Sequence, residues 1–255
     1  MTGAPATSAD SWLRRFHPRP EEGLRLVCFP HAGGSASAYF RMSRALHTSM
    51  EVIAVQYPGR QDRRAEPAVD NITGLADLIT AELRDAPARP TLLFGHSMGA
   101  MVAFEVARRL EAVAEGPLAL IASGRRAPST ARPGARPMHL LDDDGIVEEL
   151  RALNGTHSQI LKDEQLLAMV LPALRNDYRA VETYTYAPGP LLHCPVLGLV
   201  GEDDPQATLP EVLAWARHTD GGFTLRVFNG GHFYLDAHPD EVAGVIREYC
   251  TGGTA

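Results

Sequence analysis

The stretch Phe94-Gly95-His96-Ser97-Met98-Gly99-Ala100 has the form Gly-x-Ser-x-Gly. An apolar run before it predicts a strand, and the helical spacing of residues 101–110 predicts a helix after it. Strand, sharp turn and helix are the context of a nucleophile elbow, in which a strained turn lifts a serine clear of a sheet. Side chains at the two glycines would collide with the neighbouring strand and helix. The stretch therefore predicts that Ser97 is a nucleophile, although the motif alone could arise by chance in a chain with 23 glycines.

Short apolar segments recur along the chain and alternate with segments of helical spacing. Apolar runs of strand length indicate burial on both faces, which predicts an α/β fold whose mostly parallel sheet is flanked by helices. A length of 255 residues is enough for one large α/β domain, and we expect residues 1–255 to form a single one. The expected strands are 24–29, 52–55, 92–94, 118–122, 196–200 and 223–228, and the expected helices outside the elbow are 38–46, 72–83 and 242–249, after a short amphipathic lead-in at 12–16.

Residues 125–190 break this alternation, because they contain no convincing strand. Proline, arginine and small residues at 127–137 indicate a loop. Two or three amphipathic helices should follow. One should start at Asp142-Asp143-Asp144 and end at Asn154-Gly155, and another should be capped by Asp163 and kinked at Pro172. Helices inserted on the C-terminal side of a sheet predict a lid over the site, although a packing subdomain would have the same pattern. The apolar face of the first helix is formed by Ile146, Leu150 and Leu153.

A serine hydroxyl needs a base to accept its proton and a carboxylate to orient that base, in the chain order serine, acid, histidine. Gly230-Gly231-His232 follows the last expected strand, so His232 is the candidate base. Gly201-Glu202-Asp203-Asp204-Pro205 follows the strand before it and offers two neighbouring acids, only one of which can face the histidine. We expect this acid to be Asp204, with Asp203 bonding to the backbone of the turn.

Two converging backbone N–H groups are needed to stabilise the oxyanion. One should come from Met98, which follows the nucleophile, and the other from Ala32 in the glycine-rich loop His31-Ala32-Gly33-Gly34. Of the remaining histidines, His96 should pack beside the site without facing the hydroxyl, and His238, before a proline, should be structural.

Composition and motifs exclude several other classes of protein. A net charge of −7 argues against a nucleic-acid surface, and no apolar run is long enough to span a membrane. The three cysteines are far apart and no secretory leader is visible, which predicts reduced thiols and a cytoplasmic location. HExxH, a P-loop and a dinucleotide-binding glycine motif are absent, so we expect no metal and no cofactor.

Six motifs occur together in this chain, in a fixed order and over nearly its whole length. Together they resemble those of type II thioesterases of polyketide and non-ribosomal peptide synthesis. The motifs are Phe29-Pro30-His31-Ala32-Gly33-Gly34, Tyr57-Pro58-Gly59-Arg60, the Ser97 elbow, Asn176-Asp177-Tyr178-Arg179-Ala180, Gly201-Glu202-Asp203-Asp204-Pro205 and Gly230-Gly231-His232-Phe233.

The resemblance implies an alpha/beta-hydrolase fold and an editing enzyme. Such an enzyme clears stalled or aberrant acyl groups from the phosphopantetheine arm of acyl- or peptidyl-carrier proteins, so the arm belongs to the substrate. Carrier proteins are usually acidic, which makes Arg125, Arg126, Arg132 and Arg136 candidate contacts. We expect the enzyme to act as a monomer. The residues alone indicate hydrolysis of an ester or a thioester, and they leave open an esterase on small oxygen esters, an acyl transferase or a non-catalytic scaffold with this fold.

Overall fold

The computed structural model describes residues 12–19, 23–132, 134, 136–152 and 163–251. Seven strands form one sheet in the order β1-β3-β2-β4-β5-β6-β7, with β1 antiparallel to β3 and the other neighbours parallel. Their bounds are β1 Leu13–Arg15, β2 Arg25–Phe29, β3 Glu51–Val55, β4 Thr91–His96, β5 Ala119–Ser123, β6 Val196–Gly201 and β7 Phe223–Phe228. The predicted mostly parallel α/β sheet is therefore confirmed.

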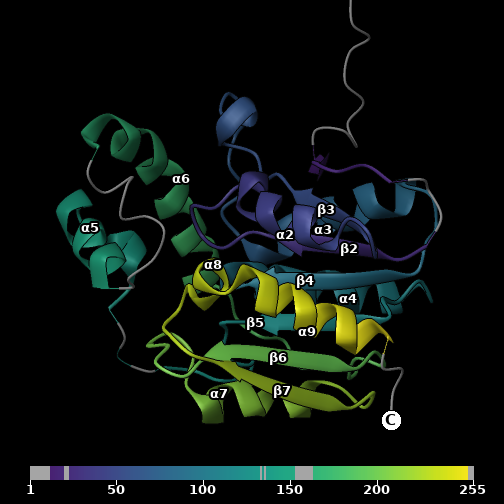
Figure 1. Ribbon diagram of the computed structural model, residues 1–255. Helices are drawn as coiled ribbons and strands as arrows, with labels where there is room; N and C mark the ends of the chain where they lie inside the picture. The colour runs from purple at the N-terminus through teal and green to yellow at the C-terminus, as the bar shows by residue number, and fades with distance from the viewer. Residues whose placement is uncertain (1–11, 20–22, 133, 135, 153–162, 252–255) are drawn as a thin grey trace, which may run out of the picture.

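Helices cover both faces of this sheet (Figure 1). On one face α2 contacts α9, and on the other α3 contacts α4. The α-helices are α2 Phe40–Leu46, α3 Ile72–Asp85, α4 Met98–Glu111, α5 Asp143–Ala152, α6 Glu164–Glu182, α7 Leu209–Leu213, α8 Tyr234–Ala237 and α9 Pro239–Thr251. Short 3-10 helices are η1 Ala36–Tyr39, η2 Gln61–Arg63, η3 Met138–Leu140 and η6 Ala214–His218.

Alternate residues of each central strand supply two separate apolar cores. In β2, Val27 and Phe29 pack with α3 and α4, whereas Leu26 and Cys28 pack with α2 and α9. All four side chains are fully buried, as expected when both faces of a parallel sheet are covered. This double burial explains why the central strands read as unbroken apolar runs.

The segment between β5 and β6 carries α5 and α6, which lie beside the edge toward which the arrows of β6 and β7 point (Figure 1). Asp163 caps α6 by accepting hydrogen bonds from the backbone N–H groups of Gln165 and Leu166 at 3.0 and 3.1 Å. The helix runs across Pro172 as one element. Whether it kinks there stays a prediction. Leu153 and Asn154-Gly155, expected in and after the first inserted helix, lie outside the described residues.

The first described residues differ from the expected lead-in. Leu13–Arg15 form an edge strand, and Leu13 lies opposite Val55 of β3. Trp12 and Leu13 are buried, and the guanidinium of Arg63 lies 4.2 Å from the centre of the Trp12 ring. The strand depends on β3, which lies about 40 residues later in the sequence, so the lead-in residues alone do not predict it.

Candidate active site

The turn between β4 and α4 has the geometry of a nucleophile elbow. Ser97 has φ 55° and ψ −118°, a strained conformation for a residue with a side chain. A Cβ at Gly95 would lie 2.2 Å from the carbonyl oxygen of Gly99, and one at Gly99 would lie 2.0 Å from that of Phe29. Both glycines are therefore required by close backbone approach, and the turn leaves Ser97 half-buried at the start of α4.

Three side chains from different strand ends meet at this turn. His232 Nε2 lies 3.0 Å from Ser97 Oγ, and His232 Nδ1 lies 3.0 and 2.9 Å from the two carboxylate oxygens of Asp204. Asp204 and His232 are 5% and 3% exposed, so this pair is shielded from water. Its arrangement matches the geometry in which a carboxylate fixes a histidine tautomer and the histidine accepts a serine proton.

Contacts between the loops after β6 and β7 fix the positions of Asp204 and His232 relative to each other. The Asp203 N–H donates to the Gly230 carbonyl at 3.0 Å, and the Gln206 N–H donates to Asp204 Oδ1 at 2.8 Å. A Cβ on Gly201 would lie 2.4 Å from the carbonyl oxygens of Gly230 and Gly231, so the two loops are in backbone contact. The Asp203 side chain is exposed, and the structure places Asp204 at the histidine.

The two expected oxyanion donors come from the elbow and from the loop after β2. Met98 is the first residue of α4, and Ala32 lies in the loop after β2. Within the described part of the chain, neither backbone N–H has a hydrogen-bond partner. The N-terminus of α4 carries partial positive charge, which also favours a negative charge near the Met98 N–H. That these two N–H groups form an oxyanion hole stays a prediction.

His96 lies beside the histidine of this site. Its ring centre is 4.9 Å from that of His232, and its Nδ1 lies 2.9 Å from Ser123 Oγ. Burial first, then His232 and His31, hold the pKa of His96 well below its usual range. His96 is therefore neutral at physiological pH and packs beside the site, as its position in the elbow predicts. His238 lies at the end of α8, with Nδ1 3.6 Å from a carboxylate oxygen of Glu241.

A cavity of about 810 Å³ is lined by all four arginines expected as carrier contacts, and it reaches the site's elements without including a triad residue. Its wall includes Met101 of α4, Gln206 beside Asp204, and Tyr178 and Val181 of α6. Arg132 is held by Glu211 at 2.6 Å, and Arg136 is exposed. Burial, followed by the charges of Arg126 and Arg132, lowers the pKa of Arg125 to about 9. The buried Nε of Arg125 has no hydrogen-bond partner within the described chain, and the charge of Glu182, which lines the same cavity, partly opposes the lowering of the Arg125 pKa.

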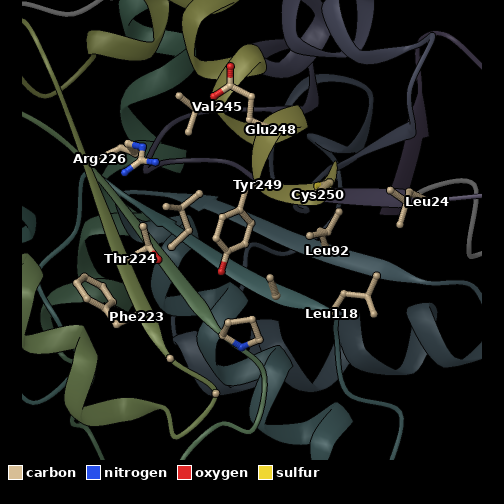
Figure 2. Close-up of a pocket in the computed structure, with 15 residues that line it drawn as sticks. Leu24, Leu92, Leu118, Phe223, Thr224, Arg226, Val245, Glu248, Tyr249 and Cys250 are labelled. Atoms are coloured by element: carbon tan, nitrogen blue, oxygen red, sulfur yellow. The ribbon is translucent and has the colours of Figure 1, made fainter. Parts of the chain in front are cut away.

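A second cavity, of about 630 Å³, lies at the opposite edge of the sheet, where the strands begin (Figure 2). Tyr249 points into it from α9, opposite Phe223 and Thr224 at the start of β7. This cavity is remote from Ser97 and contains no residue of the triad. Among the described residues, no acidic, histidine or cysteine cluster could hold a metal ion. In the same part of the chain, no helix is both long and apolar enough to cross a bilayer.

A family model described as "Thioesterase domain" matches residues 24–250, which include every side chain of this site. The chain belongs to the thioesterase family. Among its curated relatives, this thioesterase is 55% identical over 249 residues to a probable cadicidin biosynthesis thioesterase of Streptomyces griseus, covering 96% of this chain and 68% of that protein. It is 51% identical over 240 residues to thioesterase PikA5 of Streptomyces venezuelae, covering 93% of this chain and 85% of that protein.

A solved structure supports the same assignment. The thioesterase superposes on the type II thioesterase BorB from the borrelidin biosynthetic cluster with a TM-score of 0.89 and 50% identity, covering 96% and 99% of the two chains. The predicted resemblance to type II thioesterases is thereby confirmed, and with it the alpha/beta-hydrolase fold. The protein is a thioester hydrolase.

Proposed function

We propose that this thioesterase removes acyl groups from the phosphopantetheine arm of acyl- or peptidyl-carrier proteins through an acyl-Ser97 intermediate. In this role it edits stalled or aberrant chains in polyketide or non-ribosomal peptide synthesis. The observation that carries the proposal is the Ser97–His232–Asp204 chain of contacts, at 3.0 and 2.9 Å, in a family that includes a probable cadicidin biosynthesis thioesterase and a type II thioesterase of the borrelidin biosynthetic cluster.

The contacts give each residue one role in the reaction. Ser97 Oγ attacks the thioester carbonyl while its proton moves to His232 Nε2, and Asp204 stabilises the resulting imidazolium. The Ala32 and Met98 N–H groups bind the oxyanion. When the tetrahedral intermediate collapses, the C–S bond breaks and the imidazolium proton passes to the leaving thiolate. Water then attacks the acyl-enzyme, His232 takes its proton, and the second collapse returns that proton to Ser97 and releases the acid.

The cavity beside Gln206 and Met101 is the proposed room for the acyl group, because it adjoins both the acid's loop and the nucleophile's helix. The inserted segment 125–190 then acts as a lid, with α6 as one wall and residues 127–132 and 136–137 as another. Of the four arginines, the exposed Arg136 is the one best placed to meet an acidic carrier protein, whereas Arg132 is already neutralised by Glu211. All chemical steps come from the chain's own groups, so the proposal includes no metal and no cofactor. We further propose that residues 1–255 act as one monomeric domain in the cytoplasm.

The test is a panel of acyl groups loaded on a carrier protein, run beside matched oxygen esters and beside Ser97→Ala. We expect hydrolysis of the acyl-carrier thioesters by the wild type, and a fall of about 10⁶-fold in kcat for Ser97→Ala. Faster turnover of the oxygen esters would favour an esterase. Retained turnover in Ser97→Ala would contradict the mechanism. Covalent labelling of Ser97 by a fluorophosphonate separates the enzyme from a non-catalytic scaffold, and product analysis with added alcohols or amines separates hydrolysis from acyl transfer.

A further inference from the structure

The motif at 176–180 supplies a buried carboxylate that none of the proposed chemical steps uses. Asp177, on α6, is fully buried and accepts a hydrogen bond from the backbone N–H of Gly33 at 2.8 Å. Gly33 follows Ala32 in the oxyanion loop. The contact therefore joins the inserted helix to a loop 144 residues earlier in the sequence.

A second motif residue completes the contact. Arg60 binds Asp177 in bidentate fashion, with NH1 to Oδ2 at 2.6 Å and NH2 to Oδ1 at 2.7 Å. The same NH1 donates to the carbonyl oxygen of Gly34 at 2.9 Å. A bidentate arginine–carboxylate pair fixes orientation as well as distance. One ion pair thus holds an N–H and a C=O of two consecutive residues of the loop.

Packing limits the loop from the same side. A Cβ on Gly33, whose φ is +73°, would lie 2.6 Å from Leu174 Cδ1. Leu174 and Asp177 are three residues apart and so share one face of α6. At the start of the loop, the Tyr57 hydroxyl donates to the Pro30 carbonyl at 3.2 Å, and the Arg60 guanidinium lies 5.1 Å from the centre of the Tyr57 ring.

We propose that Asp177 and Arg60 are positioning residues, which set the direction of the Ala32 N–H in the oxyanion hole. The inference rests on the proposed function. Ala32 itself has no hydrogen bond within the described chain, so its orientation comes from its neighbours Gly33 and Gly34, both held by this ion pair. The inserted segment is then part of the catalytic geometry as well as a cover, and α6 must stay docked at Asp177 whenever acylation occurs.

The testing variant is Asp177→Asn. The oxygen of the new side-chain amide can take the place of Oδ2 and accept from the Gly33 N–H. Its nitrogen then takes the place of Oδ1 and faces the NH2 nitrogen of Arg60, so two donors oppose each other. We expect kcat on the propionyl thioester of N-acetylcysteamine to fall by about 10²-fold, the size of a misplacement near 1 Å, while KM changes little. Losing an oxyanion donor outright costs roughly 10²–10³-fold and sets the upper limit.

Glu51→Gln is the matched control. Glu51 is also a buried carboxylate paired with an arginine, Arg89, at 2.7 Å, but it lies where β3 begins, at the edge of the sheet away from Ser97. We expect a comparable fall in thermal midpoint and an unchanged kcat. Because Asp177→Asn leaves the Arg60 charge unpaired, the double variant Arg60→Gln/Asp177→Asn, which buries no charge, serves if the single variant does not fold. It should still lose about 10-fold in kcat, because the bidentate clamp is gone.

Two readouts separate positioning from a general loss of structure. Affinity for a boronic acid, which forms a tetrahedral adduct on Ser97, should fall in parallel with kcat in the Asp177 variants and stay unchanged in Glu51→Gln. The acid limb of the pH–rate profile should keep its place, because His232 and Asp204 are untouched. An unchanged kcat and boronate affinity in folded Asp177 variants would overturn the inference, and so would a shifted acid limb. If the wild type does not hydrolyse the thioesters but boronate affinity still falls in the Asp177 variants and not in Glu51→Gln, the proposed function is contradicted and the positioning role is not.

Discussion

Replacing Asp204 by asparagine is the most direct test of the site. Asp204 Oδ1 accepts the Gln206 N–H at 2.8 Å, and Oδ2 lies 2.9 Å from His232 Nδ1. The new amide oxygen should take the place of Oδ1, which has a fixed donor. The NH₂ group then falls at the Oδ2 position and donates to His232 Nδ1. This arrangement places the ring proton on Nε2, 3.0 Å from Ser97 Oγ, where an acceptor is needed.

The magnitude follows from this reversed tautomer. The same change in a well-studied serine protease triad lowers kcat by about 10⁴-fold with the geometry intact, equivalent to roughly 5.4 kcal/mol of lost transition-state stabilisation. We expect a fall of that order here in thioester turnover, with little change in KM. The thermal midpoint should change little as well, because asparagine keeps the shape of the side chain and its bond to Gln206.

Asp203→Asn provides the control from the adjacent position. The Asp203 side chain is exposed, and only its backbone N–H joins the loop, donating to Gly230 at 3.0 Å. Its kcat should stay within about threefold of the wild type. Steady-state hydrolysis of an N-acetylcysteamine thioester, with circular dichroism to confirm folding, measures both variants. The reasoning is refuted if Asp204→Asn keeps a tenth or more of wild-type kcat, or if the two variants lose activity equally.

Three further predictions follow. Gly99→Ala should lower the free energy of unfolding by more than about 3 kcal/mol, because its Cβ would lie 2.0 Å from the Phe29 carbonyl oxygen. Gly244→Ala on α9 is the control: no atom lies within 4 Å of its Cβ, so it should raise the free energy of unfolding by about 0.5–1 kcal/mol. Urea titration measures both variants. Burial lowers the pKa of His96, so below pH ~6.5 the unfolded chain binds a proton that the folded chain does not, and the free energy of unfolding should decrease as the pH falls, by up to about 1.4 kcal/mol per pH unit for this one group. His96→Gln should make this slope smaller without abolishing it, because burial also lowers the pKa of His218. Burial also raises the pKa of the Cys28 thiol, so mass spectrometry should find Cys28 unmodified by iodoacetamide until the chain unfolds.

Most of the sheet could be predicted from the sequence because its central strands are buried on both faces. A run such as Leu26 to Phe29 has to be apolar throughout, and the loops after such strands must meet at one edge. The strand at Leu13–Arg15 gave no such signal, because it is three residues long and lies at an edge. Its existence depends on Val55 and its neighbours in β3.

The role of Asp177 was also beyond sequence reasoning. An aspartate within an amphipathic helix is normally a solvated residue, and nothing near it in the sequence announces a partner. Its partners Arg60 and Gly33 lie 117 and 144 residues away, so only the fold shows that the carboxylate is buried and paired. The motif was visible, but the physical reason for it was not.

The local sequence does not decide which of the two adjacent acids, Asp203 or Asp204, faces the histidine. Asp203 and Asp204 have the same chemistry and follow the same strand, and their side chains leave the turn in different directions. That direction is set by the hydrogen bond from Asp203 N–H to Gly230 and by the backbone contact of Gly201 with the same loop. Both contacts involve the loop that carries His232. The loop that carries His232 therefore determines which acid faces the histidine. Any variant that separates the backbone of Gly201 from that of Gly230 should displace Asp204 from His232, although no triad residue is changed.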